Sequence, residues 1–255
     1  MKFLQYVFFI FPLLISCQQY EKQPYDKNEE TLRAFPLSTT EIIFDSLWVK
    51  RDSLTYLRLE NIRNLYLSDT DSIPSWISNF KHLKSIESFS GEKKITTIPK
   101  DIGENVNLTH IELPHNHITK IPSSLYDLKK LERLNLSDNN LKKIDAKIGN
   151  LKEIKIILLS DNQNLLNIPE EICNLSYLIS LPINNTSISN LPKCLKNMKN
   201  IERINVSKTK MENFPIEILS APKLKTIHAK DLKLKNYKEI KSICEKRNIT
   251  FYYDE

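Results

Sequence analysis

A recurring pattern of apolar and polar positions runs through most of this chain. In the segment LERLNLSDNNLKKI, residues 131–144, five apolar positions recur, and the polar residue Asn139 holds a fixed place among them. The apolar positions are Leu131, Leu134, Leu136, Leu141 and Ile144. Copies of the pattern are spaced 21 to 25 residues apart and begin at residues 62, 83, 108, 131, 154, 178, 201 and 224. Such a period predicts a solenoid, in which each unit buries its apolar face against its neighbours.

Different patterns flank these copies. The segments 41–50 (EIIFDSLWVK) and 54–62 (LTYLRLENI) predict strands. Residues 237–248 (YKEIKSICEKRN) have the spacing of an amphipathic helix and precede the strand-like segment ITFYY. The end units of a solenoid would otherwise expose an apolar layer and a strand edge, so these segments are predicted to cap both ends.

Written as L-x-x-L-x-L-x-x-N-x-L-x-x-I-P, the unit resembles the leucine-rich repeat family in its 23-residue class, over about two-thirds of the chain. The resemblance implies an α/β solenoid with a curved parallel β-sheet on the concave face and an irregular or helical convex side. It also implies that Asn116, Asn139 and Asn162 stack as a ladder whose amides bond backbone groups of the turns. The same slot holds threonine in three other copies, at Thr70, Thr186 and Thr209. The ladder should therefore weaken toward both ends.

The first residues have a different composition from the rest. Lys2 precedes an apolar run, residues 3–15, which is too short to span a bilayer and has the proportions of a signal peptide. The run ends in LISC, residues 14–17, which resembles the lipobox of bacterial lipoproteins. That resemblance implies cleavage before Cys17 and acylation of this cysteine. Residues 1–16 are thus predicted to be a lipoprotein signal peptide, with a plain secretory signal as the alternative.

The remainder divides into four predicted parts. Residues 17–38 are polar and lack an apolar period, which predicts a flexible tether behind the lipid anchor. An N-terminal cap (39–61), the repeats (62–231) and a C-terminal cap (232–255) follow. Because Gln18 rather than aspartate follows the cysteine, the resemblance to lipoproteins favours the outer membrane of a bacterial cell envelope. The side of the membrane that the protein faces stays open.

Composition agrees with a folded globular chain, and the charge does not point to a nucleic-acid partner. Hydrophobic residues make up 40% of the sequence and glycines number only 3, as in globular rather than disordered proteins. The formal net charge of +6 falls by one unit to +5 when Lys2 leaves with the signal peptide. The basic residues are scattered and no aromatic cluster accompanies them, so nucleic-acid binding is not expected.

Motifs for catalysis or metal binding are weak. The triplet SDN at 137–139 and 160–162 imitates one element of penicillin-binding enzymes, but both copies lie at equivalent repeat positions and no K-T-G follows. His110, His115 and His117 lack a carboxylate or cysteine at a familiar metal-ligand spacing. We therefore expect no enzyme activity, no cofactor and no metal.

Three cysteines remain once Cys17 is lipidated, so at most one internal disulfide can form. Cys173 and Cys194 should lie on the convex side of adjacent coils, two positions out of register. Their pairing stays open, and buried thiols are favoured over a bridge, as for Cys244.

The outward positions of the predicted strands define the candidate binding surface, since the family usually binds partners on its concave face. The position between the paired leucines gives Tyr66, Glu87, Glu112, Asn135, Leu158, Pro182, Asn205 and His228. The position two residues earlier gives Asn64, Ser85, His110, Arg133, Ile156, Ser180, Arg203 and Thr226. Polar residues dominate, but Ile156, Leu158 and Pro182 should form an apolar centre rimmed by Arg133 and Arg203. This arrangement predicts the partner-binding site.

The expected protein is a membrane-anchored, monomeric, non-catalytic binder of a protein or peptide. Its second partner would be the lipid membrane, through acylated Cys17. A glycan or cell-wall binder would need stacking aromatics, and Tyr66 is the only one in the two columns. An architectural component of the envelope without a specific ligand is the remaining alternative.

Overall fold

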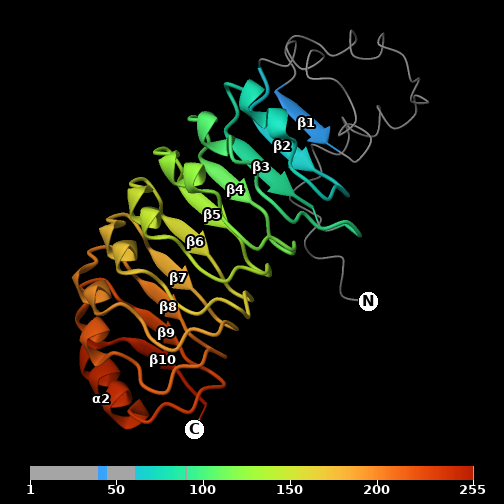
Figure 1. The fold of residues 1–255 in the computed structure, drawn as a ribbon. Coiled ribbons are helices and arrows are strands. Elements are labelled where there is room, and N and C mark those ends of the chain that lie inside the picture. The colour runs from blue at the N-terminus through green and yellow to red at the C-terminus, as the bar shows by residue number, and fades with distance from the viewer. Residues whose placement is uncertain (1–39, 45–60, 90, 255) are drawn as a thin grey trace, which may run out of the picture. The chain divides into compact units, whose positions relative to one another are not determined.

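The computed structural model describes residues 40–44, 61–89 and 91–254, all within one compact unit that begins at Ser38. These residues form ten strands in a single sheet, and every strand pairs in parallel with its neighbour in sequence order (Figure 1). The strands are β1 (Glu41–Phe44), β2 (Asn64–Leu67), β3 (Ser85–Ser88), β4 (His110–Glu112), β5 (Arg133–Asn135), β6 (Ile156–Leu158), β7 (Ser180–Pro182), β8 (Arg203–Asn205), β9 (Thr226–His228) and β10 (Thr250–Tyr252). Each starts 21 to 25 residues after the one before it. The predicted solenoid with a curved parallel sheet is confirmed.

Short helices on the convex side return the chain from one strand to the next. The described residues include seven 3₁₀ helices: η4 (Ser75–Asn79), η5 (Ile102–Glu104), η6 (Ser123–Asp127), η7 (Ala146–Asn150), η8 (Glu170–Asn174), η9 (Lys193–Asn197) and η10 (Ile216–Ser220). Five of them directly follow the proline at the I-P position of the repeat, which Ile, Leu or Phe precedes. These prolines are the N-cap residues, with φ between −57° and −71°, and each lacks an N–H that the first turn would leave without a partner.

Alternate residues of each strand point into the layer between the sheet and the 3₁₀ helices. In β5, Leu134 is fully buried, whereas Arg133 and Asn135 stay half exposed. Ile111 and Ile157 occupy the matching position on the two neighbouring strands and are equally buried. Burial of one such side chain stabilises the fold by about 1.5–3 kcal/mol. Each coil obtains this burial from its neighbours, because a single coil has nothing to cover its own apolar row.

The terminal strands continue the register of the repeats. β1 pairs with β2 through Glu41 and Asn64, and β10 pairs in parallel with β9. Both strands belong to segments that the sequence assigns to caps. Residues 45–60 of the N-terminal cap lie outside the described residues, as do the predicted signal peptide, the tether and Cys17.

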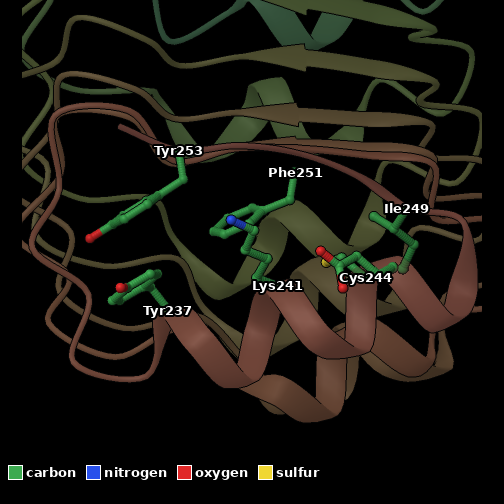
Figure 2. Close-up of a pocket in the computed structure, with 7 residues that line it drawn as sticks. Tyr237, Lys241, Cys244, Ile249, Phe251 and Tyr253 are labelled. Atoms are coloured by element: carbon green, nitrogen blue, oxygen red, sulfur yellow. The ribbon is translucent and has the colours of Figure 1, made fainter. Parts of the chain in front are cut away.

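A helix covers the C-terminal end, where the sequence predicts one. α2 (Tyr237–Arg247) buries Ile240 and Cys244 against the last coil, and burial raises the pKa of the Cys244 thiol to about 11. Figure 2 shows the rings of Phe251 and Tyr253 on the strand side of this contact, with centroids 5.5 Å apart. Within the described ranges, no helix is long and apolar enough to cross a membrane.

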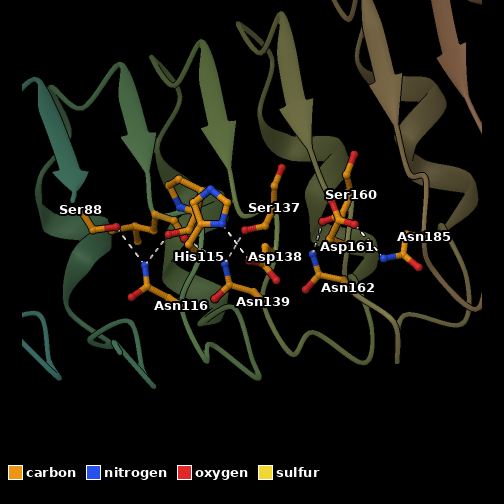
Figure 3. Close-up of polar contacts among 12 residues, drawn as sticks. Ser88, His115, Asn116, Ser137, Asp138, Asn139, Ser160, Asp161, Asn162 and Asn185 are labelled. Carbon is orange, nitrogen blue, oxygen red and sulfur yellow. Dashed lines mark hydrogen bonds and ion pairs between the residues drawn. The ribbon is translucent and has the colours of Figure 1, made fainter. Parts of the chain in front are cut away.

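The amide of Asn139 joins two neighbouring coils at the turn that follows the strand (Figure 3). Its Oδ1 accepts a hydrogen bond from the Ile118 N–H at 2.9 Å, and its Nδ2 lies within hydrogen-bond distance of three carbonyl oxygens. Asn116 and Asn162 each accept a bond of 2.9 Å from the preceding coil in the same way. These amides satisfy backbone groups that the turns leave without a backbone partner.

Threonine at the same slot makes its hydrogen bonds within its own coil. Thr186 and Thr209 donate to the carbonyls of Ile183 and Val206 in their own coils, at 2.8 Å and 2.7 Å. The threonine hydroxyl is attached directly to Cβ, one bond nearer the backbone than the asparagine Oδ1. Its oxygen therefore does not reach an N–H of the preceding coil. The bridge between coils is therefore strongest in the middle of the repeats.

The expectation of free, buried thiols at Cys173 and Cys194 is wrong. The two residues form a disulfide between η8 and η9, with Cα atoms 6.0 Å apart, and both side chains are only half buried. Adjacent convex helices meet with an offset, because a Cβ placed on Gly103 would lie 2.9 Å from the Cβ of Ser124. Cys173 and Cys194 have the same separation of 21 residues as this pair. Two positions out of register is thus the spacing at which convex side chains of adjacent coils touch.

The asparagine ladder predicts a stability effect at Asn139. Asn139→Leu should lower the free energy of unfolding by about 1–3 kcal/mol, because buried backbone groups lose their partners. Asn139→Thr should lose part of this amount, and Asn140→Leu, which changes the exposed neighbour, serves as the control. Urea unfolding followed by circular dichroism measures all three. Equal midpoints for Asn139→Leu and the wild type would contradict the role of the amide.

The disulfide predicts a second effect. The double variant Cys173→Ser/Cys194→Ser should unfold more easily by about 3 kcal/mol, because the bridge constrains the unfolded chain. Dithiothreitol should destabilise the wild type by a similar amount. It should leave the double variant unchanged, so the variant is the control for other effects of the reductant. A wild-type urea midpoint that does not respond to dithiothreitol would contradict the bridge.

Candidate binding site on the concave face

The concave face presents two rows of side chains, to which each strand from β2 to β10 contributes one residue per row. The first row is Tyr66, Glu87, Glu112, Asn135, Leu158, Pro182, Asn205, His228 and Tyr252. The second row is Asn64, Ser85, His110, Arg133, Ile156, Ser180, Arg203, Thr226 and Thr250. Parallel strands lie about 4.8 Å apart, so adjacent members of a row are close neighbours.

Ile156, Leu158 and Pro182 come together at the middle of this face. They stand on β6 and β7, which lie side by side because the Leu159 N–H donates to the Pro182 carbonyl at 3.2 Å. All three side chains are half exposed, in contrast to the fully buried Leu181 between the outward positions of β7. We refer to Ile156, Leu158 and Pro182 as the apolar patch.

Pro182 also weakens the sheet locally. Its ring nitrogen has no hydrogen to donate, and β6 and β7 share only the register pair Ile156 and Ser180, whereas β5 and β6 share three pairs. Proline is normally confined to edge strands or bulges. The apolar patch therefore lies where two neighbouring strands share fewer paired residues than elsewhere in the sheet.

The structure distinguishes the two arginines that the sequence treats alike. Arg133 donates through Nε to Glu112 Oε1, while Asn135 Nδ2 donates to Glu112 Oε2 at 2.9 Å. Arg203 is exposed and has no ion-pair partner in the described part of the chain. Of these two arginines, Arg203 is the one whose positive charge is unpaired among the described residues.

Two concave aromatic residues were missed by sequence reasoning. Phe89 is 48% exposed just beyond β3, and its ring stacks on Tyr66 with centroids 5.7 Å apart. Tyr252 is 44% exposed and stacks on His228 at 4.4 Å. Extending the first row by one coil would have found Tyr252. Phe89 follows Ser88, which occupies the second leucine position of the L-x-L segment in its repeat, and reading the position after that one would have found it. Tyr66 is therefore not the only aromatic side chain on this face.

Carboxylates gather on the N-terminal strands. Glu112 lies beside Glu87 in the first row, and Glu41 on β1 accepts a bond of 3.1 Å from Asn64. Burial raises the pKa of Glu87, and the charges of Glu112 and Glu41 raise it further, although His110 and a hydrogen bond from Ser85 oppose them. Glu87 has no ion-pair partner among the residues that the structure describes.

The histidines and the SDN triplets have other contacts. His110 is exposed in the second row, whereas His115 bonds Asp138 at 2.8 Å on the turn (Figure 3). The described residues contain no group of three or more side chains suited to hold a metal ion. Asn139 and Asn162, the last residues of the triplets, belong to the ladder.

The C-terminal pocket of Figure 2 lies at the end of the solenoid and not on either row. It is lined by Tyr237, Lys241, Cys244, Glu245, Ile249, Phe251 and Tyr253. The Tyr237 ring stacks on Tyr253 at 5.2 Å, and Tyr253 stacks on Phe251. These rings and α2 cover the final coil.

Comparison with known proteins agrees with this geometry. Residues 90–141 and 106–163 match the sequence pattern of the leucine rich repeat family. The fold is that of a leucine-rich repeat protein. No curated protein sequence matches the chain.

Solved leucine-rich repeat structures share the fold at low sequence identity. A leucine-rich repeat protein of Leptospira interrogans superimposes with a TM-score of 0.63 at 22% identity, over 78% of this chain and 56% of the other. The ectodomain of the Arabidopsis thaliana receptor kinase GASSHO1/SCHENGEN3, in complex with CASPARIAN STRIP INTEGRITY FACTOR 2, gives 0.63 at 23% identity, over 78% and 24%. The plant peptide hormone receptor RGFR1, in complex with RGF2, gives 0.55 at 20% identity, over 78% and 41%. The chain thus spans between about a quarter and just over half of these proteins.

Proposed function

We propose that this protein binds an extended segment of a protein or peptide along the concave face of its leucine-rich repeats, without catalysing a reaction. The observation that carries the proposal is the apolar patch at the middle of the sheet. Ile156 and Leu158 are half exposed on a face whose other outward residues are mostly polar. An apolar centre with a polar rim is typical of binding hot spots.

The related structures support a polypeptide partner. The receptor RGFR1 is a peptide hormone receptor, and it is bound to RGF2 in the solved complex. A glycan would need a continuous platform of rings, whereas the pairs Tyr66–Phe89 and His228–Tyr252 lie at opposite ends of the sheet and stack within themselves. The geometry therefore favours a polypeptide over a sugar.

We further propose that the protein is an exported lipoprotein, anchored to the membrane of a bacterial envelope through acylated Cys17. The motif LISC at residues 14–17 supports the anchor. The disulfide between Cys173 and Cys194 supports an oxidising compartment outside the cytosol. A polar tether at 17–38 would hold the repeats off the lipid surface. The outer membrane remains the favoured address because Gln18 follows the cysteine.

Leu158→Asp tests the binding site. Peptides selected from a phage-displayed random dodecamer library on the wild-type protein should bind the variant at least about 30-fold more weakly, a loss of about 2 kcal/mol. The melting temperature and the circular dichroism spectrum should stay unchanged, because Leu158 is a surface residue. Leu166→Asp is the matched control, since Leu166 is 61% exposed away from the two rows. Equal loss in both variants, or no loss in either, would contradict the proposed site.

Cys17→Ser tests the anchor. The full chain, expressed in a Gram-negative host, should move from the membrane fraction to the soluble fraction and lose metabolic labelling with fatty acid. The variant Cys244→Ser, which changes a buried thiol, should keep both properties. Unchanged membrane association of Cys17→Ser would refute the lipoprotein assignment.

A further inference from the structure

Glu87 is a carboxylate of the concave face that has no ion-pair partner among the described residues. In the first row it stands between Tyr66 and Glu112, directly opposite each on the adjacent strands. Both oxygens of Glu112 accept hydrogen bonds, and one oxygen of Glu41 does so. Like charges directly opposite on paired strands repel. A half-buried carboxylate in this position is stabilised if a positive charge is supplied from outside.

A stacked pair of aromatic rings, of which Phe89 is exposed and Tyr66 half buried, lies beside this carboxylate. Tyr66 is the direct neighbour of Glu87 across β2 and β3, and Phe89 follows Glu87 by two residues, just beyond the end of β3. The two rings stack nearly parallel, with an interplanar angle of 21°. A guanidinium or ammonium group is attracted both to a ring face and to a carboxylate. Glu87, Tyr66 and Phe89 are therefore chemically matched to an arginine or lysine side chain.

A positive charge on the other side of the apolar patch from Glu87 favours one orientation of a bound ligand. Arg203, on β8, is exposed and unpaired among the described residues, so it repels a basic side chain. Arg133 does not offset Glu87, because it is engaged by Glu112. A ligand that is basic at one end and apolar in its middle fits the face in one orientation only, with its basic end toward β3.

We propose that the partner is an extended polypeptide segment whose arginine or lysine side chain lies between Glu87 and the Tyr66–Phe89 rings, while an apolar side chain of the same segment covers Ile156 and Leu158. This inference rests on the proposed binding function and names the chemistry of the ligand. The segment crosses the strands, from β3 to β6 and β7. The three strand spacings of about 4.8 Å from β3 to β6 correspond to about four or five residues of extended chain.

The stability of the free protein provides an independent signature. Burial raises the pKa of Glu87 above that of the unfolded chain, and Glu112 and Glu41 raise it further against His110 and Ser85. The folded state then holds the proton more tightly, so this residue's contribution to stability falls as pH rises through the folded pKa. Replacing the carboxylate should therefore stabilise the free protein at neutral pH. A residue that only supports the fold would show the opposite effect.

The experiment uses dodecamer peptides selected by phage display on the wild-type protein and retained only if Leu158→Asp abolishes their binding. These peptides should carry arginine or lysine about four or five positions from an apolar residue. Glu87→Gln should weaken their binding at least about tenfold and raise the melting temperature at pH 7. Replacing the basic residue of the peptide by glutamine should weaken binding to the wild type and change little in Glu87→Gln. Phe89→Ser should also weaken binding, because it removes one of the two rings.

Glu104→Gln, on the convex helix η5, is the control and should bind like the wild type. Peptides that depend on Leu158 but carry no basic residue, or that bind Glu87→Gln normally, would overturn this inference and leave the proposed function standing. A library that yields no peptide dependent on Leu158 would overturn the proposed function itself. The two failures are thus distinguishable.

Discussion

The stacking of one coil on the next is the constraint on which the whole structure depends. Each coil has one apolar row and several turn groups that it cannot satisfy alone, so both are supplied by the neighbouring coil. The amide of Asn139 makes this plain, because it accepts from Ile118 of the preceding coil while it bonds carbonyls on both. The residue before the slot, such as Asp138, takes a positive φ of 51° so that the chain can turn there. Aspartate and asparagine tolerate this conformation better than most residues.

The same stacking decides where a binding surface can exist. Since each strand contributes only one outward residue to each row, the properties of the concave face vary mainly along the solenoid axis. Carboxylates and a ring pair occupy the first strands, the apolar patch the middle, and Arg203 a later strand. A ligand that lies across the strands therefore meets these features in sequence.

The local costs on this face coincide with the proposed contacts. Pro182 removes a donor from an interior strand, and Glu87 holds a carboxylate opposite another carboxylate. Neither Pro182 nor Glu87 stabilises the folded protein by these features. The apolar core beneath them is complete, because Leu181 and Ile86 are fully buried. Sites where a sequence departs from the rules of its own fold are often functional. The coincidence links the two proposals to one surface.

The sequence by itself determined the repeat register, and with it the strands, the buried leucines, the asparagine slot and the membership of the two rows. It placed Ile156, Leu158 and Pro182 on the surface because position within a coil follows from the period. Contacts between coils were decided only by the tertiary structure. Helices on the convex side meet two residues out of register, which pairs Cys173 with Cys194.

On the concave side, the pairing of Arg133 with Glu112, the stacking of Phe89 on Tyr66 and the extension of the first row to Tyr252 were likewise set by the structure. A period fixes which face a side chain occupies. It does not fix the lateral offset or the rotamer with which that side chain meets the next coil, because those depend on how the coils tilt and pack against one another.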